Sequence, residues 1–150
     1  MMAGSFSVGR VRQATKADIQ HMTALAKTAY AAFPVDWRAI PPWLDTIIGR
    51  PDILAYVAPD AAVIANVQTP WFWRPLAKSI VVLFAAGVGA PWALTRCLDP
   101  VFRAARDDFS VSDIKIDAET GKDLGPLVRR LAKRYNLPVV NIPAYTVRLR

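Results

Sequence analysis

Gly87 and Gly89, which are separated by one residue, form the strongest candidate for chemistry in this sequence. They follow a strongly apolar run and precede a helical pattern, within the sequence Gly87-Val88-Gly89-Ala90. Glycines allow a backbone to approach a bound group closely, and the start of a helix presents unpaired amide donors with partial positive charge. A turn of this kind can present backbone amides to a bound group. A tight strand-to-helix turn without a ligand explains the same residues, and both interpretations stay open here.

Other side chains that commonly carry chemistry are few. His21 is the only histidine, and no Cys or Glu lies near it at metal-ligand spacing. Cys97, the only cysteine, is flanked by Leu94 and Leu98 and is expected to be a buried apolar thiol. We identify no phosphate loop of the Walker type, no paired-cysteine zinc pattern and no nucleophile elbow. The sequence predicts no metal site.

An aromatic segment precedes the apolar run. Trp71, Phe72 and Trp73, followed by Arg74, could stack on bases or contact a protein partner. Packing as a lid over the core explains the segment equally simply.

The charge balance is compatible with anionic partners. The chain has 150 residues, with 19 Lys and Arg against 12 Asp and Glu, and its net charge is +7. Such a charge suits a nucleic acid, an anionic membrane surface or a phosphorylated cofactor. Arg129, Arg130, Lys133 and Arg134 form the densest basic cluster, which is either a solvated helix face or a contact for phosphate groups.

Two features bear on localisation. The longest uncharged stretch, 79–95, is interrupted by Gly87, Gly89 and Pro91, so a buried strand, a turn and a helix explain it better than a membrane span. A single cysteine excludes an intramolecular disulfide and suits a reducing compartment. The first ten residues lack the pattern of a secretory signal, so we expect a cytoplasmic protein.

The periodicity of apolar residues predicts one α/β domain over residues 1–150. A capping box at Thr15–Asp18 opens the first helix, Pro34 stops it, and Gly49 ends a second one. Pro59-Asp60-Ala61 joins a hairpin, and Pro100 is expected to kink or divide a later helix, with Asp99 capping its second part. The expected strands span 8–13, 53–58, 62–68, 79–85, 111–117, 139–142 and 145–149, and the expected helical regions span 15–33, 36–49, 94–105 and 123–135.

Four phrases, in this order, resemble the GCN5-related N-acetyltransferase (GNAT) superfamily. They are VRQATKADIQHMTALAKTAY, ILAYVAPDAAVIANV, TPWFWRPLAKSIVVLFAAGVGAPWAL, which is similar to phage-encoded members, and LVRRLAKRYNLPVVNIPAYTVRL. The resemblance implies a mixed, mostly antiparallel central sheet flanked by about four helices. It also implies acetyl-CoA as cofactor and an amine as acceptor.

The resemblance assigns roles to particular residues. The pyrophosphate of acetyl-CoA is expected at the strand-to-helix turn, with help from Arg96. Tyr135 is the candidate acid that protonates the leaving thiolate, although the family's tyrosine aligns near Ala132. The acceptor side of the cleft is expected at Trp71, Phe72 and Trp73. The expected cofactor-binding residues are Phe84, Ala85, Gly87, Val88, Gly89, Ala90 and Arg96.

Departures from the family pattern leave two functions open. Phe84-Ala85-Ala86 stands where the family commonly has Gln or Arg, and the only glutamate, Glu119, lies outside the central strand. The sequence is compatible with an active N-acetyltransferase of unknown acceptor. It is also compatible with a catalytically inactive member from a phage or mobile element, acting as a structural or virion-associated interaction protein. A binder of nucleic acid or membrane surfaces is a third hypothesis.

Overall fold

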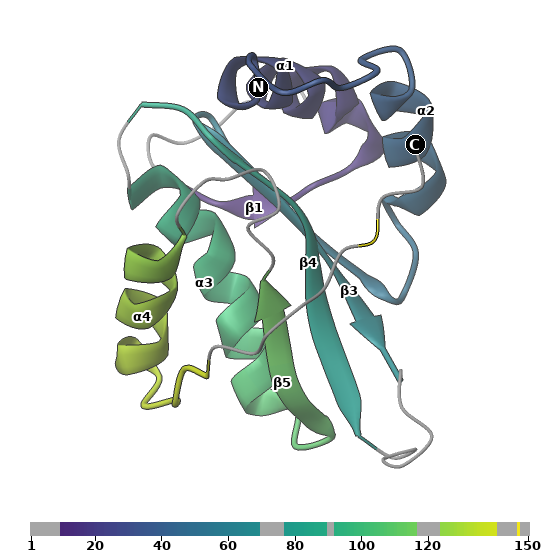
Figure 1. The fold of residues 1–150 in the computed structure, drawn as a ribbon. Coiled ribbons are helices and arrows are strands. Elements are labelled where there is room, and N and C mark those ends of the chain that lie inside the picture. The colour runs from purple at the N-terminus through teal and green to yellow at the C-terminus, as the bar shows by residue number, and fades with distance from the viewer. Residues whose placement is uncertain (1–9, 70–76, 90–91, 117–123, 141–146, 148–150) are drawn as a thin grey trace.

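The computed structural model describes residues 10–69, 77–89, 92–116, 124–140 and 147. In this part of the chain five strands form one sheet in the order β1-β2-β3-β4-β5 (Figure 1). The neighbours β1 to β4 pair antiparallel, whereas β4 and β5 run parallel. The strands are β1 (Arg12–Gln13), β2 (Ile53–Ala58), β3 (Ala61–Gln68), β4 (Lys78–Gly87) and β5 (Val111–Ile116). The mixed, mostly antiparallel sheet that we expected is confirmed.

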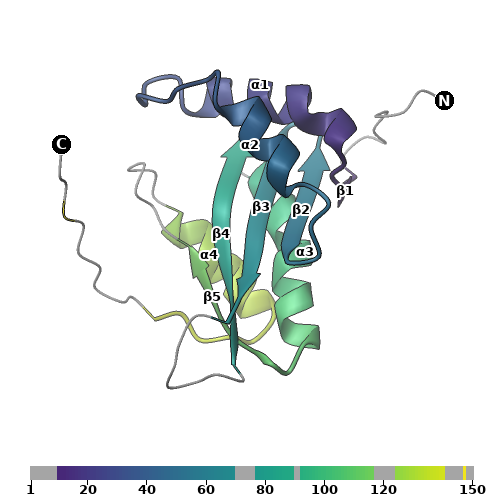
Figure 2. The ribbon, with the colours of Figure 1, turned by 90° about the vertical axis from the view of Figure 1, so that its right-hand side faces the viewer.

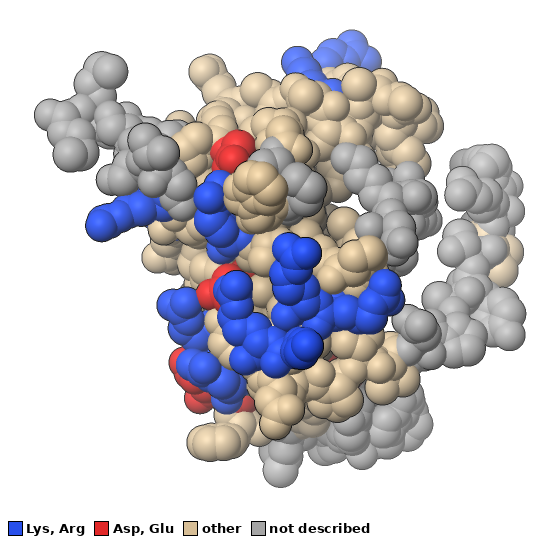
Figure 3. Space-filling view, turned by 90° about the vertical axis from the view of Figure 1, so that its left-hand side faces the viewer, with Lys and Arg blue, Asp and Glu red and all other residues tan. Residues whose placement is uncertain are grey.

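Helices cover both faces of this sheet. Helices α1 (Ile19–Ala29) and α2 (Ile40–Ile47) lie on one face, and α3 (Trp92–Asp107) and α4 (Gly125–Arg134) lie on the other (Figures 1 and 2). Lys and Arg side chains gather on the outer side of the α3–α4 layer (Figure 3). None of the described helices is both long enough and apolar enough to cross a membrane.

The sheet separates two apolar cores. One contains Met22, Leu44 and Ile64, and the other contains Val63, Leu98 and Leu131, all fully buried. The adjacent residues Val63 and Ile64 belong to different cores because side chains along a strand alternate between its two faces.

The start of the first helix follows its predicted capping box. A 3-10 turn, η1 (Lys16–Asp18), leads directly into α1. The buried carboxylate of Asp18 accepts the Thr15 amide at 2.8 Å and two hydrogen bonds from Arg12, at 2.8 and 2.6 Å. Burial alone would raise the pKa of Asp18, but the hydrogen bonds from Arg12 and Thr15 outweigh it and lower the pKa. The strand before this turn, β1, is shorter than predicted, since residues 10 and 11 are not in a strand.

The predicted hairpin is present with a tighter turn. Ala58 pairs with Ala61, so only Pro59 and Asp60 lie between β2 and β3, and Ala61 is already a strand residue. Asp60 is therefore held at a fixed position at the end of the sheet.

Strand β4 contains a β-bulge at its centre. Val82 pairs with Ala65 and Phe84 pairs with Ile64, which leaves Leu83 as an extra residue in β4. Val82 is also the last residue of β4 that pairs with β5, opposite Ile116. Because a bulge bends its strand and increases the local twist, this one separates the half of β4 that pairs with β5 from the half that leads into the glycine turn.

Helix α3 corrects part of one expectation, because Pro100 does not divide the helix. Pro100 lies inside one uninterrupted helix, and Asp99 binds side chains of α3 and α4 instead of capping a second helix. Proline removes one hydrogen bond from a helix interior, and the packing of the buried residues Leu98, Val101 and Phe102 offsets this loss.

The end of α4 is set by Asn136. Its φ of 54° lies in the left-handed region, and the Leu137 amide closes the end by donating to the Ala132 carbonyl at 2.8 Å. Val139 and Val140, the described part of one predicted strand, are not in a strand. The rest of the predicted final strands, apart from Val147, lies outside the described residues.

Candidate functional site

The turn between β4 and α3 is the candidate site, and two long-range contacts fix it in place. Gly87 is the last residue of β4 and pairs with Ala61 at the start of β3. The Val88 amide donates to the Asp60 carbonyl at 2.8 Å. The glycine turn is thus joined to the β2–β3 hairpin, at the end of the sheet where α3 begins.

The two glycines serve different purposes. A Cβ built on Gly87 would lie 3.2 Å from Cβ of Leu94, so Gly87 allows α3 to pack closely against the end of β4. Gly89 has a φ of 80°, a conformation that other residues rarely adopt, and a Cβ on it would meet no atom within 4 Å. Gly89 therefore shapes the turn next to open space, while Gly87 sets the helix packing. Ala90, the last residue predicted for this turn, lies outside the described residues.

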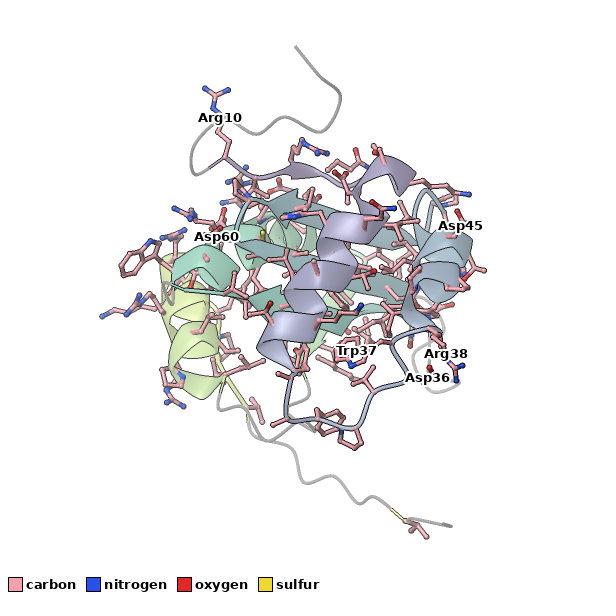
Figure 4. All side chains as sticks on the ribbon, turned by 90° about the horizontal axis from the view of Figure 1, so that it is seen from above. Arg10, Asp36, Trp37, Arg38, Asp45 and Asp60 are labelled. Carbon is pink, nitrogen blue, oxygen red and sulfur yellow. The ribbon has the colours of Figure 1, made fainter. Side chains whose placement is uncertain are left out.

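Arg96 forms an ion pair that the sequence pattern did not predict. Its Nη2 donates to Oδ2 of Asp60 at 3.2 Å, and Figure 4 shows Asp60 near the start of α3. The Nε atom of Arg96 and Oδ1 of Asp60 are buried and have no hydrogen-bond partner among the described residues. The guanidinium thus lies within two turns of the start of α3 with one donor unused.

Phe84 and Ala85, two further residues predicted to bind the cofactor, lie in β4 just after the bulge. Phe84 packs against the core under α1 and α2, and Ala85 packs against the core under α3 and α4. The two side chains therefore lie on opposite faces of the sheet.

Tyr30 is a residue of this region that sequence reasoning missed. Its hydroxyl donates a hydrogen bond to the Ala85 carbonyl, although the two residues are 55 positions apart. Burial raises the pKa of Tyr30, which keeps the phenol protonated at neutral pH. The apolar stripe of the first helix identified Tyr30 only as a core residue, because periodicity does not show which group its hydroxyl contacts.

Tyr135, the predicted acid, is placed against α3. Its hydroxyl donates to Oδ1 of Asp99 at 2.8 Å, its ring stacks on Phe102 with centroids 6.3 Å apart, and the Arg106 guanidinium lies 5.1 Å from the ring centroid. Burial and the hydrogen bond to Asp99 raise the pKa of Tyr135. The phenol is therefore protonated at neutral pH, as a proton donor must be. In this conformation its hydroxyl donates a hydrogen bond to Asp99.

Cys97, His21 and the aromatic segment are the remaining residues singled out in the sequence. Cys97 is buried, which raises the pKa of its thiol to about 12, as expected of an unreactive core cysteine. His21 contacts the Ala58 carbonyl through Nε2 at 3.0 Å. Trp71, Phe72 and Trp73, the predicted acceptor side, lie outside the described residues.

A groove of about 730 Å³ opens elsewhere, at the outer edge of β5. It is lined by residues of α3, β5 and α4 and by 137–140, with Arg106, Lys115 and Arg129 among them. Gly87, Val88, Gly89 and Arg96 do not line it, so the groove and the glycine turn are separate features.

Comparison with solved structures relates the fold of this chain to that of acetyltransferases. No family model and no curated protein matches the sequence. The fold matches an acetyltransferase from Arthrobacter sp. FB24, of uncertain function, with a TM-score of 0.69, 15% identity and coverage of 97% of this chain and 99% of that one. It also matches a predicted acetyltransferase from Clostridium acetobutylicum solved with acetyl-CoA, with a TM-score of 0.63, 13% identity and coverage of 92% and 95%.

A third neighbour is an aminoglycoside N-acetyltransferase in complex with CoA. Its TM-score is 0.66 at 9% identity, with coverage of 94% of this chain and 95% of that one. At such identities the likeness concerns the fold alone. The α/β fold of the chain is that of GNAT-type acetyltransferases.

Proposed function

We propose that this protein binds acetyl-CoA at the β4–α3 turn and transfers the acetyl group to an amine. One observation carries the proposal: a glycine turn with a left-handed Gly89 leads from a bulged strand into the start of the 16-residue helix α3. Two structures with the same fold contain acetyl-CoA or CoA. The acceptor amine is not identified by these features.

The donors available to a pyrophosphate follow from the hydrogen bonds of the turn. The Val88 amide is used by the Asp60 carbonyl, so Val88 anchors the turn. We assign to the phosphates the amide of Gly89 and the amides of the first turn of α3. The amides of a first helical turn have no carbonyl acceptor within the helix. Arg96 supplies positive charge next to them, partly neutralised by Asp60.

The reaction can proceed with little direct participation of side chains. Acetyl-CoA supplies an activated thioester, in which the C–S bond breaks as the C–N bond to the amine forms. The amine loses a proton, and the departing thiolate gains one. Strand β4 carries no carboxylate between Lys78 and Gly87, so orientation of the two reactants provides most of the acceleration in this proposal, and a base would add about 10²–10⁴-fold.

Calorimetry with acetyl-CoA tests the binding step. We expect saturable binding that Gly89→Leu weakens by about tenfold or more, because a side chain at positive φ strains the turn that presents the amides.

Gly49→Leu is the matched control for this experiment. Gly49 has a φ of 96°, also has open space at its Cβ position, and lies just after α2 on the other face of the sheet. Its substitution should cost similar stability and leave acetyl-CoA binding unchanged. No binding to the wild-type protein at millimolar acetyl-CoA, or an equal loss in both variants, would contradict the proposal.

A second candidate function is supported by the absence of a carboxylate on β4 and by the engagement of the Tyr135 hydroxyl with Asp99. In this alternative the chain is a catalytically silent protein of the same fold that binds a protein partner through Trp71 and Trp73. Release of free CoA thiol in the presence of a panel of amines distinguishes the two. Turnover supports the enzyme, while a pull-down of partners that the double change of Trp71 and Trp73 abolishes supports the silent protein.

A further inference from the structure

The outer side of the α3–α4 layer carries six exposed basic side chains, which we call the basic face (Figure 3). They are Arg103 and Arg106 on α3 and Arg129, Arg130, Lys133 and Arg134 on α4. The helix α4 has no acidic residue, and its apolar residues Leu131 and Ala132 are buried beneath the cations.

The charge of the basic face is not balanced by its neighbours. Asp99 pairs with Arg103 and Arg134, and Asp107 pairs with Arg106. A third carboxylate, Asp108, is exposed directly after α3, so the six cations and three carboxylates leave an excess of three positive charges. Arg129, Arg130 and Lys133 take part in none of the ion pairs that the described residues form. Such an excess on one face raises the local concentration of a polyanion.

Three of the guanidinium groups are held in place before any ligand arrives. Asp99 accepts Arg103 and Arg134, each at 2.8 Å, and Arg106 lies over the Tyr135 ring. The side chains of Arg103 and Arg134 nevertheless remain 58% and 56% exposed. Guanidinium groups that are fixed and accessible are well suited to phosphate oxygens, which they bind through paired hydrogen bonds.

Two exposed aromatic residues flank these cations. Trp92 opens α3 and is 56% exposed, and Phe109 follows the end of α3 and is fully exposed. Trp92, Arg103 and Arg106 lie at helical positions i, i+11 and i+14, which place them within about 40–60° on one side of α3. The helix carries cations along this side, with an aromatic ring at its start and another just beyond its end. Rings of this kind provide stacking surfaces for unpaired bases.

We propose that the basic face binds single-stranded nucleic acid, with phosphates on the six cations and bases stacked on Trp92 and Phe109. This function goes beyond acetyl transfer and does not depend on it. A membrane surface fits less well, because the apolar side of α4 is buried in the core and is not available for insertion among lipids.

Salt dependence of binding provides the test. With a fluorescent single-stranded oligonucleotide and the 150-residue chain, we expect measurable binding at about 50 mM salt that weakens steeply towards about 200 mM. If all six cations contact phosphates, the slope of log K against log salt is about −4, from roughly −0.7 per contact. The triple variant Arg129→Ala, Arg130→Ala and Lys133→Ala should reduce this slope by about 2 and weaken binding. It removes none of the described ion pairs, so we expect it to fold normally.

A charge-matched variant separates the basic face from net charge. Lys16→Ala, Lys27→Ala and Arg38→Ala also remove three exposed cations, all from the α1–α2 side of the sheet. Figure 4 shows Arg38 beside Asp36, on the far side of the molecule from Asp60 and the start of α3. This variant should keep the wild-type slope. An equal change in both triple variants, or an oligonucleotide affinity that salt does not affect, would overturn the proposal.

Stacking and two competing ligands are tested with the same proteins. Trp92→Ala and Phe109→Ala should each weaken binding on the order of tenfold without changing the salt slope. Binding to phosphatidylserine vesicles but not to the oligonucleotide would replace the proposal with a membrane contact. If the α4 triple variant lost acetyl-CoA in calorimetry and kept the oligonucleotide, the cations would belong to the cofactor site and the proposal would be wrong.

Discussion

The carboxylate of Asp99 is the residue-scale link between helices α3 and α4. It accepts hydrogen bonds from Arg103 on its own helix and from Arg134 and Tyr135 at the end of α4, each at 2.8 Å. Burial alone would raise the pKa of Asp99, yet the hydrogen bonds from Tyr135 and Arg134 outweigh it and the pKa lies below its ordinary value. The charged form is thus stabilised by folding, and the same carboxylate orients part of the basic face.

Asp99→Asn should lower the free energy of unfolding by about 1–3 kcal/mol at neutral pH. The amide has one acceptor oxygen in place of two, so it cannot accept all the hydrogen bonds that Arg103, Arg134 and Tyr135 donate to the carboxylate. Since the folded pKa is lowered, the stability due to Asp99 is present above the unfolded pKa of about 3.9 and is lost as pH falls through the folded value. Urea titrations at neutral pH and below pH 4 check both effects. A variant that loses as much stability in acid as the wild type would show that other carboxylates, such as Asp18, dominate this range.

Tyr135→Phe separates a structural role from a catalytic one. Loss of the hydrogen bond to the charged Asp99 should lower stability by about 1.5–3 kcal/mol, measured by urea denaturation. Once an acceptor amine is identified, an unchanged kcat would remove Tyr135 from the chemistry. A lower kcat at unchanged KM for acetyl-CoA would support the predicted role of its phenol as the acid.

At the scale of elements, β4 and α3 decide the geometry of the candidate site. The bulge at Leu83 changes the direction of β4 after its last pair with β5, and Gly87 brings α3 against the end of the strand. The hairpin contributes through Asp60, whose backbone and side chain contact Val88 and Arg96. The site is therefore built from the junction of three elements.

Pro100 destabilises the centre of helix α3, and its replacement should therefore raise stability. Pro100 lacks the N–H that would bond the carbonyl four residues earlier, although the helix continues through it. We expect Pro100→Ala to raise the free energy of unfolding by about 1–3 kcal/mol, as followed by urea denaturation. A loss of stability instead would mean that the packing of α3 on the sheet requires the helix shape that proline imposes.

At the scale of the whole molecule, the described residues form one sheet with a separate apolar core on each face. Leu44 and Leu98 are fully buried in different cores, and the strands between them contribute residues to both. The shared strands should couple the two layers in unfolding, as in a single cooperative domain.

Truncation of the two leucines tests this coupling. Leu44→Ala and Leu98→Ala should each cost about 2–5 kcal/mol, and the double variant should cost nearly their sum because the sites share no contacts. Unfolding followed by tryptophan fluorescence and by far-ultraviolet circular dichroism should give coincident transitions. Transitions that separate in either variant would show that the layers on the two faces unfold independently.

The sequence by itself determined the order and type of most elements. Capping at Thr15, the two-residue alternation of strands and the left-handed glycine at the end of α2 depend on neighbours a few residues away, so they can be recognised locally. The glycine turn and the basic cluster on α4 were recognisable for the same reason. The resemblance to acetyltransferases adds the cofactor that this turn is proposed to bind.

Only the tertiary structure decided which side chains meet. Arg96 reaches Asp60 and Tyr135 reaches Asp99, each across 36 positions, and Tyr30 reaches Ala85 across 55. The continuity of α3 through Pro100 was likewise decided by packing, which outweighed a local preference. These contacts depend on how the helices pack on the two faces of the sheet. Residues distant in sequence become neighbours only when that packing forms.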